Sequence, residues 1–277
     1  MKTVAAAKED WNERLGRAPR VAEGLARLRR GEPVVFGNVV GALAPLLVSF
    51  LRPLESSPWL VILPTLGEAQ GFVDDLALIA PDLEPKFFPA SDEAGFTDVA
   101  TGSVFGRRLD LAERLRSGES GLLVVTTIGA CLEPLPTSGG DATTRLALRV
   151  GEELDREELI GRLEAAGFRR APLVERPGEY AVRGGVLDLY DHRGSHPLRV
   201  ELFGDEVESL RRFDVVSQRS LRELREEDVS LVTPGGLEDL GPSLAGGLPS
   251  TVRCVARDPD RIRIQGERRV ERLHGEG

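Results

Sequence analysis

Short apolar runs alternate with helix-length segments along the first half of the chain. The runs are rich in Val, Leu, Ile and Phe, as expected of buried strands, and they lie at residues 33–37, 59–64, 86–90 and 121–127. Apolar residues also recur every three to four positions, which predicts helices at residues 5–31, 42–51, 68–80 and 104–115. This alternation predicts an α/β fold in which helices cover both faces of a parallel sheet.

The pattern changes after residues 134–144, a segment rich in Pro, Gly, Ser and Thr that we interpret as a linker. A helix is predicted at residues 155–168, and short strands separated by glycine-containing turns follow it. In LRVELF, at residues 198–203, Leu198, Val200 and Leu202 alternate with Arg199 and Glu201, which is typical of a half-buried antiparallel strand. The sequence therefore predicts an α+β unit with an antiparallel sheet over residues 143–234.

The last part of the chain returns to the first pattern. A connection rich in Gly and Pro, residues 233–250, precedes a predicted strand at 251–257 and a predicted helix at 259–273. We interpret these two elements as a return to the parallel layer, which the α+β domain would then interrupt as an insertion. The predicted domains are residues 1–142, 143–234 and 235–277. We expect such a return to continue beyond these elements, as part of a longer polypeptide.

Composition narrows the classes of function. The net charge is −9, whereas a protein that holds DNA unaided usually has a net basic face, because phosphate contacts dominate that affinity. No apolar run is long enough to span a membrane and the N-terminus is too polar for a secretory signal, so we expect a cytoplasmic protein without membrane contact. The cysteines and histidines lack the spacing of metal ligands, so no metal site is expected. His192 and His196 share a predicted loop and are expected to be solvated.

The segment between the first predicted strand and its helix is where an α/β protein places a phosphate-binding loop. Gly37 and Gly41 are present there, but Ala42 and Leu43 occupy the neighbourhood of the lysine and the hydroxyl that would bind phosphate and magnesium. We interpret this segment as a degenerate phosphate loop that forms a plain strand-to-helix turn. We therefore predict no ATPase activity and no bound cofactor. No Ser–His–Asp arrangement or nucleophile elbow is found, so the predicted function of these residues is not enzymatic.

Arginines gather in the second predicted domain, in a segment that also holds both tyrosines of the chain. The candidate partner-binding residues are Arg169, Arg170, Arg176, Tyr180, Arg183 and Tyr190. Arginine and tyrosine are frequent anchors of protein interfaces. Local pairing of the arginines with Glu175 and Glu179 is the alternative, and the residues alone leave both interpretations open. The Gly184–Gly185 pair predicts a turn with positive φ or a bulge, and Asp188 is predicted to be a structural hydrogen-bond acceptor.

Two motifs in this domain resemble a known family. They are PGEYAVRGGVLDLY at residues 177–190 and LRVELFGDEVESLRRFD at residues 198–214. The sequence resembles the N-terminal region of the bacterial transcription-repair coupling factors, which is itself similar to domains 1a, 2 and 1b of the excinuclease subunit UvrB. Weaker similarity extends to residues 61–76, 106–115 and 124–136.

The resemblance implies a helicase-like α/β layer without ATPase activity, and an inserted domain that recruits UvrA through arginines. By motif position Arg183 matches the arginine of the family's RG turn, and Arg169 matches the arginine that follows the domain's helix. Arg176 and Tyr190 would support them. The sequence departs from UvrB at Ala181, where UvrB has a further arginine, which implies a weaker or rearranged contact. The region of UvrB's damage-probing aromatic hairpin, residues 87–103 here, contains no tyrosine.

Three functions follow from these observations. The first is a non-catalytic adaptor that docks UvrA in transcription-coupled excision repair. The second is an ATP-dependent, UvrB-like module that remodels DNA, which the degenerate phosphate loop disfavours. The third is an autoinhibitory module whose docking surface is masked by a C-terminal regulatory domain of the parent chain. For the adaptor, the resemblance implies that RNA polymerase and DNA are bound only through domains absent from these residues.

Overall fold

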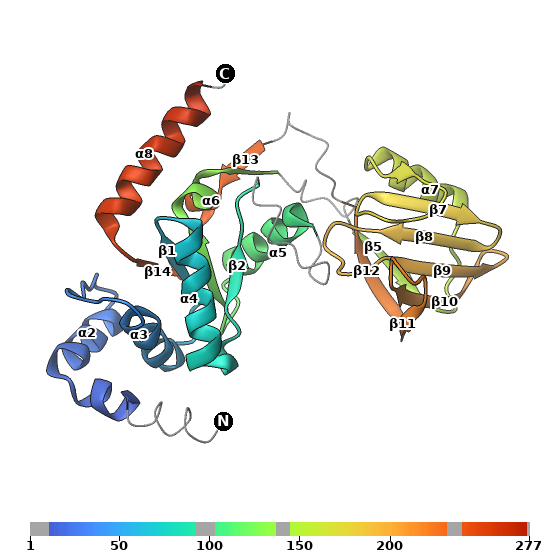
Figure 1. Ribbon diagram of the computed structural model, residues 1–277. Coiled ribbons are helices and arrows are strands. Elements are labelled where there is room, and N and C mark those ends of the chain that lie inside the picture. Colours follow the sequence, from blue (N-terminus) through green and yellow to red (C-terminus); the bar gives the residue numbers. More distant parts are fainter. Residues whose placement is uncertain (1–10, 92–102, 137–144, 232–239, 276–277) are drawn as a thin grey trace. The chain divides into compact units, whose positions relative to one another are not determined.

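The computed structural model describes residues 11–91, 103–136, 145–231 and 240–275 (Figure 1). The chain forms two compact units, and it crosses between them more than once. Unit 1 comprises Met1–Phe88, Glu113–Leu132 and Ala245–Gly277, and unit 2 comprises Pro89–Ala112 and Glu133–Leu244. The boundaries predicted at residues 142–143 and 234–235 lie outside the described residues.

A four-stranded parallel sheet forms the centre of unit 1. Its order is β14-β1-β3-β2, with β1 at Trp59–Leu63, β2 at Lys86–Phe88, β3 at Leu123–Thr127 and β14 at Arg253–Ala256. The central strands β1 and β3 are almost entirely buried, as their unbroken apolar sequences predict. Trp59 of β1 pairs with Arg253 of β14, so the late strand returns to this sheet as predicted.

Helices surround this sheet in unit 1. Residues 11–17 are helical, and the named helices are α2 at Pro19–Arg29, α3 at Leu43–Leu51, α4 at Leu66–Ile79, α6 at Ile128–Leu132 and α8 at Pro259–Gly275. Helix α4 begins with a capping box, because Thr65 accepts a hydrogen bond from the Glu68 backbone and donates one to the Glu68 carboxylate. Side chains from α3, α4, β1 and β3 form one apolar core.

Two predicted elements of unit 1 are wrong. Residues 33–37 form no strand: Val34 and Phe36 are half-buried and pack closely against Gly24 of α2, whereas Val35 is 89% exposed. The single helix predicted at residues 5–31 is interrupted at Ala18, in extended geometry, because Pro19 disfavours a helical residue before it. Residues 1–10 lie outside the described part of the chain.

Unit 2 contains a six-stranded, mostly antiparallel sheet. Its order is β11-β10-β9-β8-β7-β6, with β6 at Arg169–Arg170, β7 at Glu179–Arg183, β8 at Val186–Tyr190, β9 at Leu198–Phe203, β10 at Glu206–Phe213 and β11 at Ser220–Leu224. Only β6 and β7 pair in parallel. Two further ribbons pair β5 (Arg145–Arg149) with β12 (Glu226–Ser230), and β4 (Pro134–Pro136) with β13 (Leu240–Ser243). The start of the predicted linker is therefore a short strand. The remainder of that linker lies outside the described residues.

Successive side chains along these strands point to opposite sides, which gives the sheet two different faces. One face packs against helix α7 (Arg156–Ala165) and strands β5 and β12, in a core that includes Leu159 and Leu163 of α7 and Leu198, Val200 and Leu202 of β9. The side chains that alternate with this core form the charged face. Its members are Arg169, Glu179, Arg183, Asp188, Arg199, Glu201 and Arg211. The half-buried antiparallel strand predicted at residues 198–203 is confirmed.

Candidate protein-docking site

A buried carboxylate joins two arginines on the charged face. Asp188 is only 1% exposed, and its Oδ2 accepts a hydrogen bond of 2.6 Å from Nη2 of Arg183. Arg199 binds both oxygens of the same carboxylate, with Nε–Oδ1 at 2.7 Å and Nη2–Oδ2 at 2.9 Å. The predicted role of Asp188 as a structural hydrogen-bond acceptor is therefore confirmed. Two guanidinium groups around one carboxylate leave this cluster with a net positive charge.

Strand register brings these side chains together. Asp188 lies opposite Ala181 on one neighbouring strand and opposite Arg199 on the other. Directly opposite residues point to the same side of a sheet, so Asp188 and Arg199 share the charged face. Arg183 lies two residues beyond Ala181 on the same strand and therefore on the same face. The small side chain of Ala181 packs with the buried pair Val174 and Tyr190.

The four candidate arginines all lie on the surface. Arg183 keeps 48% of its side chain exposed although it is bound to Asp188. Arg169 is 75% exposed and lies 3.2 Å from Glu179, the residue opposite it on β7. Arg170 and Arg176 are also exposed. Glu179 therefore pairs locally with Arg169, as the alternative interpretation of the sequence predicted. The pair still leaves the Arg169 side chain largely accessible.

The two tyrosines, in contrast, belong to the interior. Tyr180 is 0% exposed, and its hydroxyl lies 2.5 Å from Glu164 of α7. Burial and this hydrogen bond raise the pKa of Tyr180 to about 12. Tyr190 is also buried and donates a hydrogen bond to the Ser195 carbonyl. Neither ring is accessible to a partner, so their predicted place on a binding surface is corrected. Tyr180 belongs to the core that contains α7, whereas Tyr190 takes the same side of the sheet as Asp188 and is buried there with Val174 and Ala181.

The turn after Arg183 is held close to the neighbouring strand. Gly184 has a φ of +60°, as predicted for one of the two glycines. A Cβ atom on Gly185 would lie 2.6 Å from the Leu202 carbonyl oxygen. The backbone N–H of Leu202 also donates a hydrogen bond to the Gly185 carbonyl. The β7–β8 turn therefore requires glycine at residue 185 and fixes the backbone beside Arg183.

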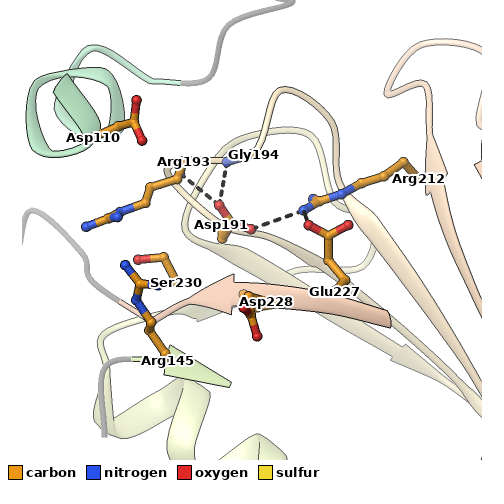
Figure 2. A pocket seen from close by; sticks show the side chains of 10 residues that line it. Asp110, Arg145, Asp191, Arg193, Gly194, Arg212, Glu227, Asp228 and Ser230 are labelled. Carbon is orange, nitrogen blue, oxygen red and sulfur yellow. Dashed lines mark hydrogen bonds and ion pairs between the residues drawn. The ribbon is translucent and has the colours of Figure 1, made fainter. Parts of the chain in front are cut away.

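A second group of charges lines a pocket of about 270 Å³ in unit 2 (Figure 2). Its central residue is Asp191, whose Oδ1 accepts a hydrogen bond of 2.8 Å from the Arg193 backbone and another from Gly194. Nη2 of Arg212 lies 3.6 Å from the other oxygen of Asp191 and 3.1 Å from Glu227. Burial raises the pKa of Asp191, and Arg212 and the two backbone N–H groups oppose this rise. Because Asp191 is held by Arg212 and by two backbone N–H groups, we interpret the network as structural.

His192 is next to this network and is not solvated. Its ring is buried, lies 3.1 Å from the Ser103 hydroxyl and meets the ring of Phe105 edge to face. Burial lowers its pKa to about 4. The prediction of a solvated histidine is therefore wrong, because a polar loop sequence does not show that the loop packs against another segment. Among the described residues no group of His, Cys, Asp or Glu could hold a metal ion.

The predicted phosphate loop has no strand before it. Gly41 has a φ of +54°, and its carbonyl oxygen lies 3.4 Å from Nη2 of Arg257, which follows β14. Leu43 begins helix α3. In a working loop the backbone N–H groups and a lysine would surround phosphate here. The predicted plain turn between strand and helix is corrected, because residues 33–42 are irregular.

Comparison with known proteins identifies the region that contains the charged face. Residues 146–232 match the family described as the UvrB interaction domain. The chain is 31% identical over 191 residues to the transcription-repair-coupling factor of Bacillus subtilis, a match that covers 69% of this chain and 16% of the relative. The corresponding protein of Escherichia coli is 30% identical over 210 residues, which cover 71% of this chain and 17% of the relative.

The resemblance to the N-terminal region of transcription-repair-coupling factors is therefore confirmed. The protein from Mycobacterium tuberculosis gives a similar match, with 32% identity over 200 residues. The chain spans about one sixth of the length of these coupling factors. All six strands of the large sheet lie inside the matched UvrB interaction domain, and so do Asp188 and its two arginines. None of the helices in the described part of the chain is long and apolar enough to cross a membrane.

Proposed function

We propose that this chain is a non-catalytic adaptor of transcription-coupled nucleotide excision repair that recruits UvrA through the charged face of unit 2. The observation that carries the proposal is the position of Arg183 within the UvrB interaction domain: half-exposed, and bound to a buried carboxylate. The similarity to transcription-repair-coupling factors supports the assignment to transcription-coupled repair, since the name of these relatives joins the two processes.

The proposed contact is between arginines and carboxylates. A guanidinium group presents several N–H donors in a flat fork that matches a carboxylate, and the bond from Arg183 to Asp188 uses Nη2 alone. Arg169, on the edge strand β6 of the same face, would give a second positive contact. Ala181 adds no further charge to this face, and we assign the main contacts to these two residues. We expect UvrA to present acidic groups opposite them.

The absence of catalysis is part of the proposal. Its support lies in the irregular segment before α3, where Arg257 contacts Gly41 and no lysine is available between residues 9 and 85. The pocket around Asp191 is not a second candidate in this proposal, because Arg212 already pairs with both Asp191 and Glu227. The test is ATP hydrolysis by the purified chain, with and without DNA. The proposal predicts no activity above that of a heat-denatured sample, and sustained hydrolysis would instead favour the ATP-dependent function.

The docking face would be available to more than one partner. Masking by a C-terminal regulatory domain of a parent chain is compatible with UvrA recruitment, because one surface can bind either partner in turn. Contacts with RNA polymerase and DNA are assigned in this proposal to other parts of a coupling factor. Binding of UvrA to this chain, compared with its Arg183→Ala variant, tests the proposed function directly.

A further inference from the structure

The exposure of the three linked side chains on the charged face rises in steps from the sheet to the surface. Asp188 is 1% exposed, Arg199 is 18% exposed and Arg183 is 48% exposed. The guanidinium of Arg199 also lies over the ring of Phe213, at 4.4 Å from its centroid. Arg199 is therefore fixed on two sides, by a ring and by a carboxylate. It binds both oxygens of Asp188 and so fixes the orientation of that carboxylate.

The carboxylate in turn restricts Arg183. An exposed arginine samples many rotamers, and a partner that binds it must immobilise the side chain at a cost in entropy. The bond between Nη2 of Arg183 and Oδ2 of Asp188 removes much of this freedom before any partner arrives. The guanidinium remains half-exposed, so the same bond leaves part of its fork accessible.

We infer that Asp188 is a positioning residue for UvrA docking: its buried carboxylate holds the Arg183 guanidinium in the orientation that meets an acidic group of UvrA. Asp188 itself is too deeply buried to touch a partner. This inference rests on the proposed function and adds a residue that acts through Arg183. Its immediate consequence is that the effect of changing Asp188 depends on whether Arg183 is present.

A double-mutant cycle on the 277-residue chain tests this dependence. The affinity for purified UvrA is measured for the unaltered chain, Asp188→Asn, Arg183→Ala and the double variant. Asp188→Asn is expected to weaken binding about fivefold, the effect of releasing one long side chain. In the Arg183→Ala background the same change is expected to have no effect. A purely structural role of Asp188 would weaken binding equally in both backgrounds.

The control is Glu226→Gln. Glu226 lies on strand β12, outside the large sheet and its charged face, and pairs with Arg149 at 3.2 Å. We expect this variant to bind UvrA like the unaltered chain. If Asp188→Asn does not fold, Asp188→Glu keeps the charge but displaces the carboxylate, and it enters the same cycle with an expected loss of about twofold to fivefold.

The outcomes separate the two proposals. If Arg183→Ala leaves the affinity for UvrA unchanged, the docking surface itself is wrong. If Arg183→Ala weakens binding but the two changes are additive, or Asp188→Asn has no effect, only the positioning role is overturned. A loss on Asp188→Asn that disappears in the Arg183→Ala background supports both.

Discussion

Nη2 of Arg183 lies 2.6 Å from Oδ2 of Asp188, yet the arginine side chain is half-exposed and the aspartate side chain is almost completely buried. The pair therefore connects a surface charge to the interior of the sheet. A surface ion pair between two flexible side chains contributes little to stability. Where one member is buried, removal of its charge costs much more, because the remaining charges lose their partner. The direction of the Arg183 side chain is set by the β8 strand rather than by solvent.

Loss of the Asp188 charge should destabilise unit 2. Asp188→Asn leaves two guanidinium groups facing each other without their shared carboxylate, which we expect to cost about 3 kcal/mol in the free energy of unfolding. Urea denaturation can follow each unit separately, because both tryptophans, Trp11 and Trp59, belong to unit 1 and both tyrosines to unit 2. The transition seen by tyrosine absorbance should shift and the tryptophan fluorescence transition should not. A tyrosine transition that shifts by less than about 1 kcal/mol would contradict this account.

Tyr180 should matter for stability and not for docking. Tyr180→Phe removes the hydroxyl that lies 2.5 Å from Glu164 and leaves the ring in the core. We expect a loss of about 1–2 kcal/mol in the free energy of unfolding, with unchanged affinity for UvrA. Calorimetry and a UvrA binding assay on the same preparation check both parts. A weaker complex formed by a stable variant would return Tyr180 to the interface.

His192 should make the folded state sensitive to mild acid. Its pKa is about 4 in the folded chain, whereas an unfolded histidine titrates near 6.5. Between these pH values the unfolded chain binds a proton that the folded chain does not, so stability falls as the pH is lowered, by about 1.4 kcal/mol per pH unit and about 3 kcal/mol in all. The measurement is the difference in unfolding free energy between the unaltered chain and His192→Gln from about pH 7 to about pH 4. Parallel curves would show that the ring is not buried in its neutral form.

Gly185→Ala should disturb the turn that carries Arg183. The added Cβ would lie 2.6 Å from the Leu202 carbonyl oxygen, so one of the two backbones must shift, and a backbone hydrogen bond joins them at this point. We expect a cost of about 2 kcal/mol in the free energy of unfolding, with a weaker complex with UvrA. Tyrosine-monitored denaturation and UvrA titration check it. If the variant is as stable as the unaltered chain, the turn is less constrained than its geometry indicates.

Much of the fold could be predicted because its signals are local. The buried strands β1 and β3 and the alternating strand β9 each follow from a few consecutive residues. The failures come from packing between separate segments, which the local pattern does not show. Residues 33–37 have the apolar content of a strand, but Val34 and Phe36 are used for packing on α2.

In the candidate site, too, local signals were read correctly and packing between segments was not. Arg169 and Arg183 were predicted from their motif positions, and both are exposed. Tyr180 was placed on the surface because its type is common in interfaces, although a tyrosine can equally fill a core when its hydroxyl finds a partner. The role of Arg199 was not predicted, because only the register of β8 against β9 places it beside Asp188. The opposite position of the two residues could have been found by aligning the two predicted strands as a hairpin.

The affinity of UvrA for Arg183→Ala tests the central claim most directly. The control is Arg149→Ala, because Arg149 is similarly exposed and similarly paired with acidic residues but belongs to strand β5, outside the large sheet. The account predicts that Arg183→Ala loses about 2 kcal/mol of binding free energy, about thirtyfold in affinity, while Arg149→Ala binds normally. Equal affinity of the unaltered chain and Arg183→Ala for UvrA would contradict it.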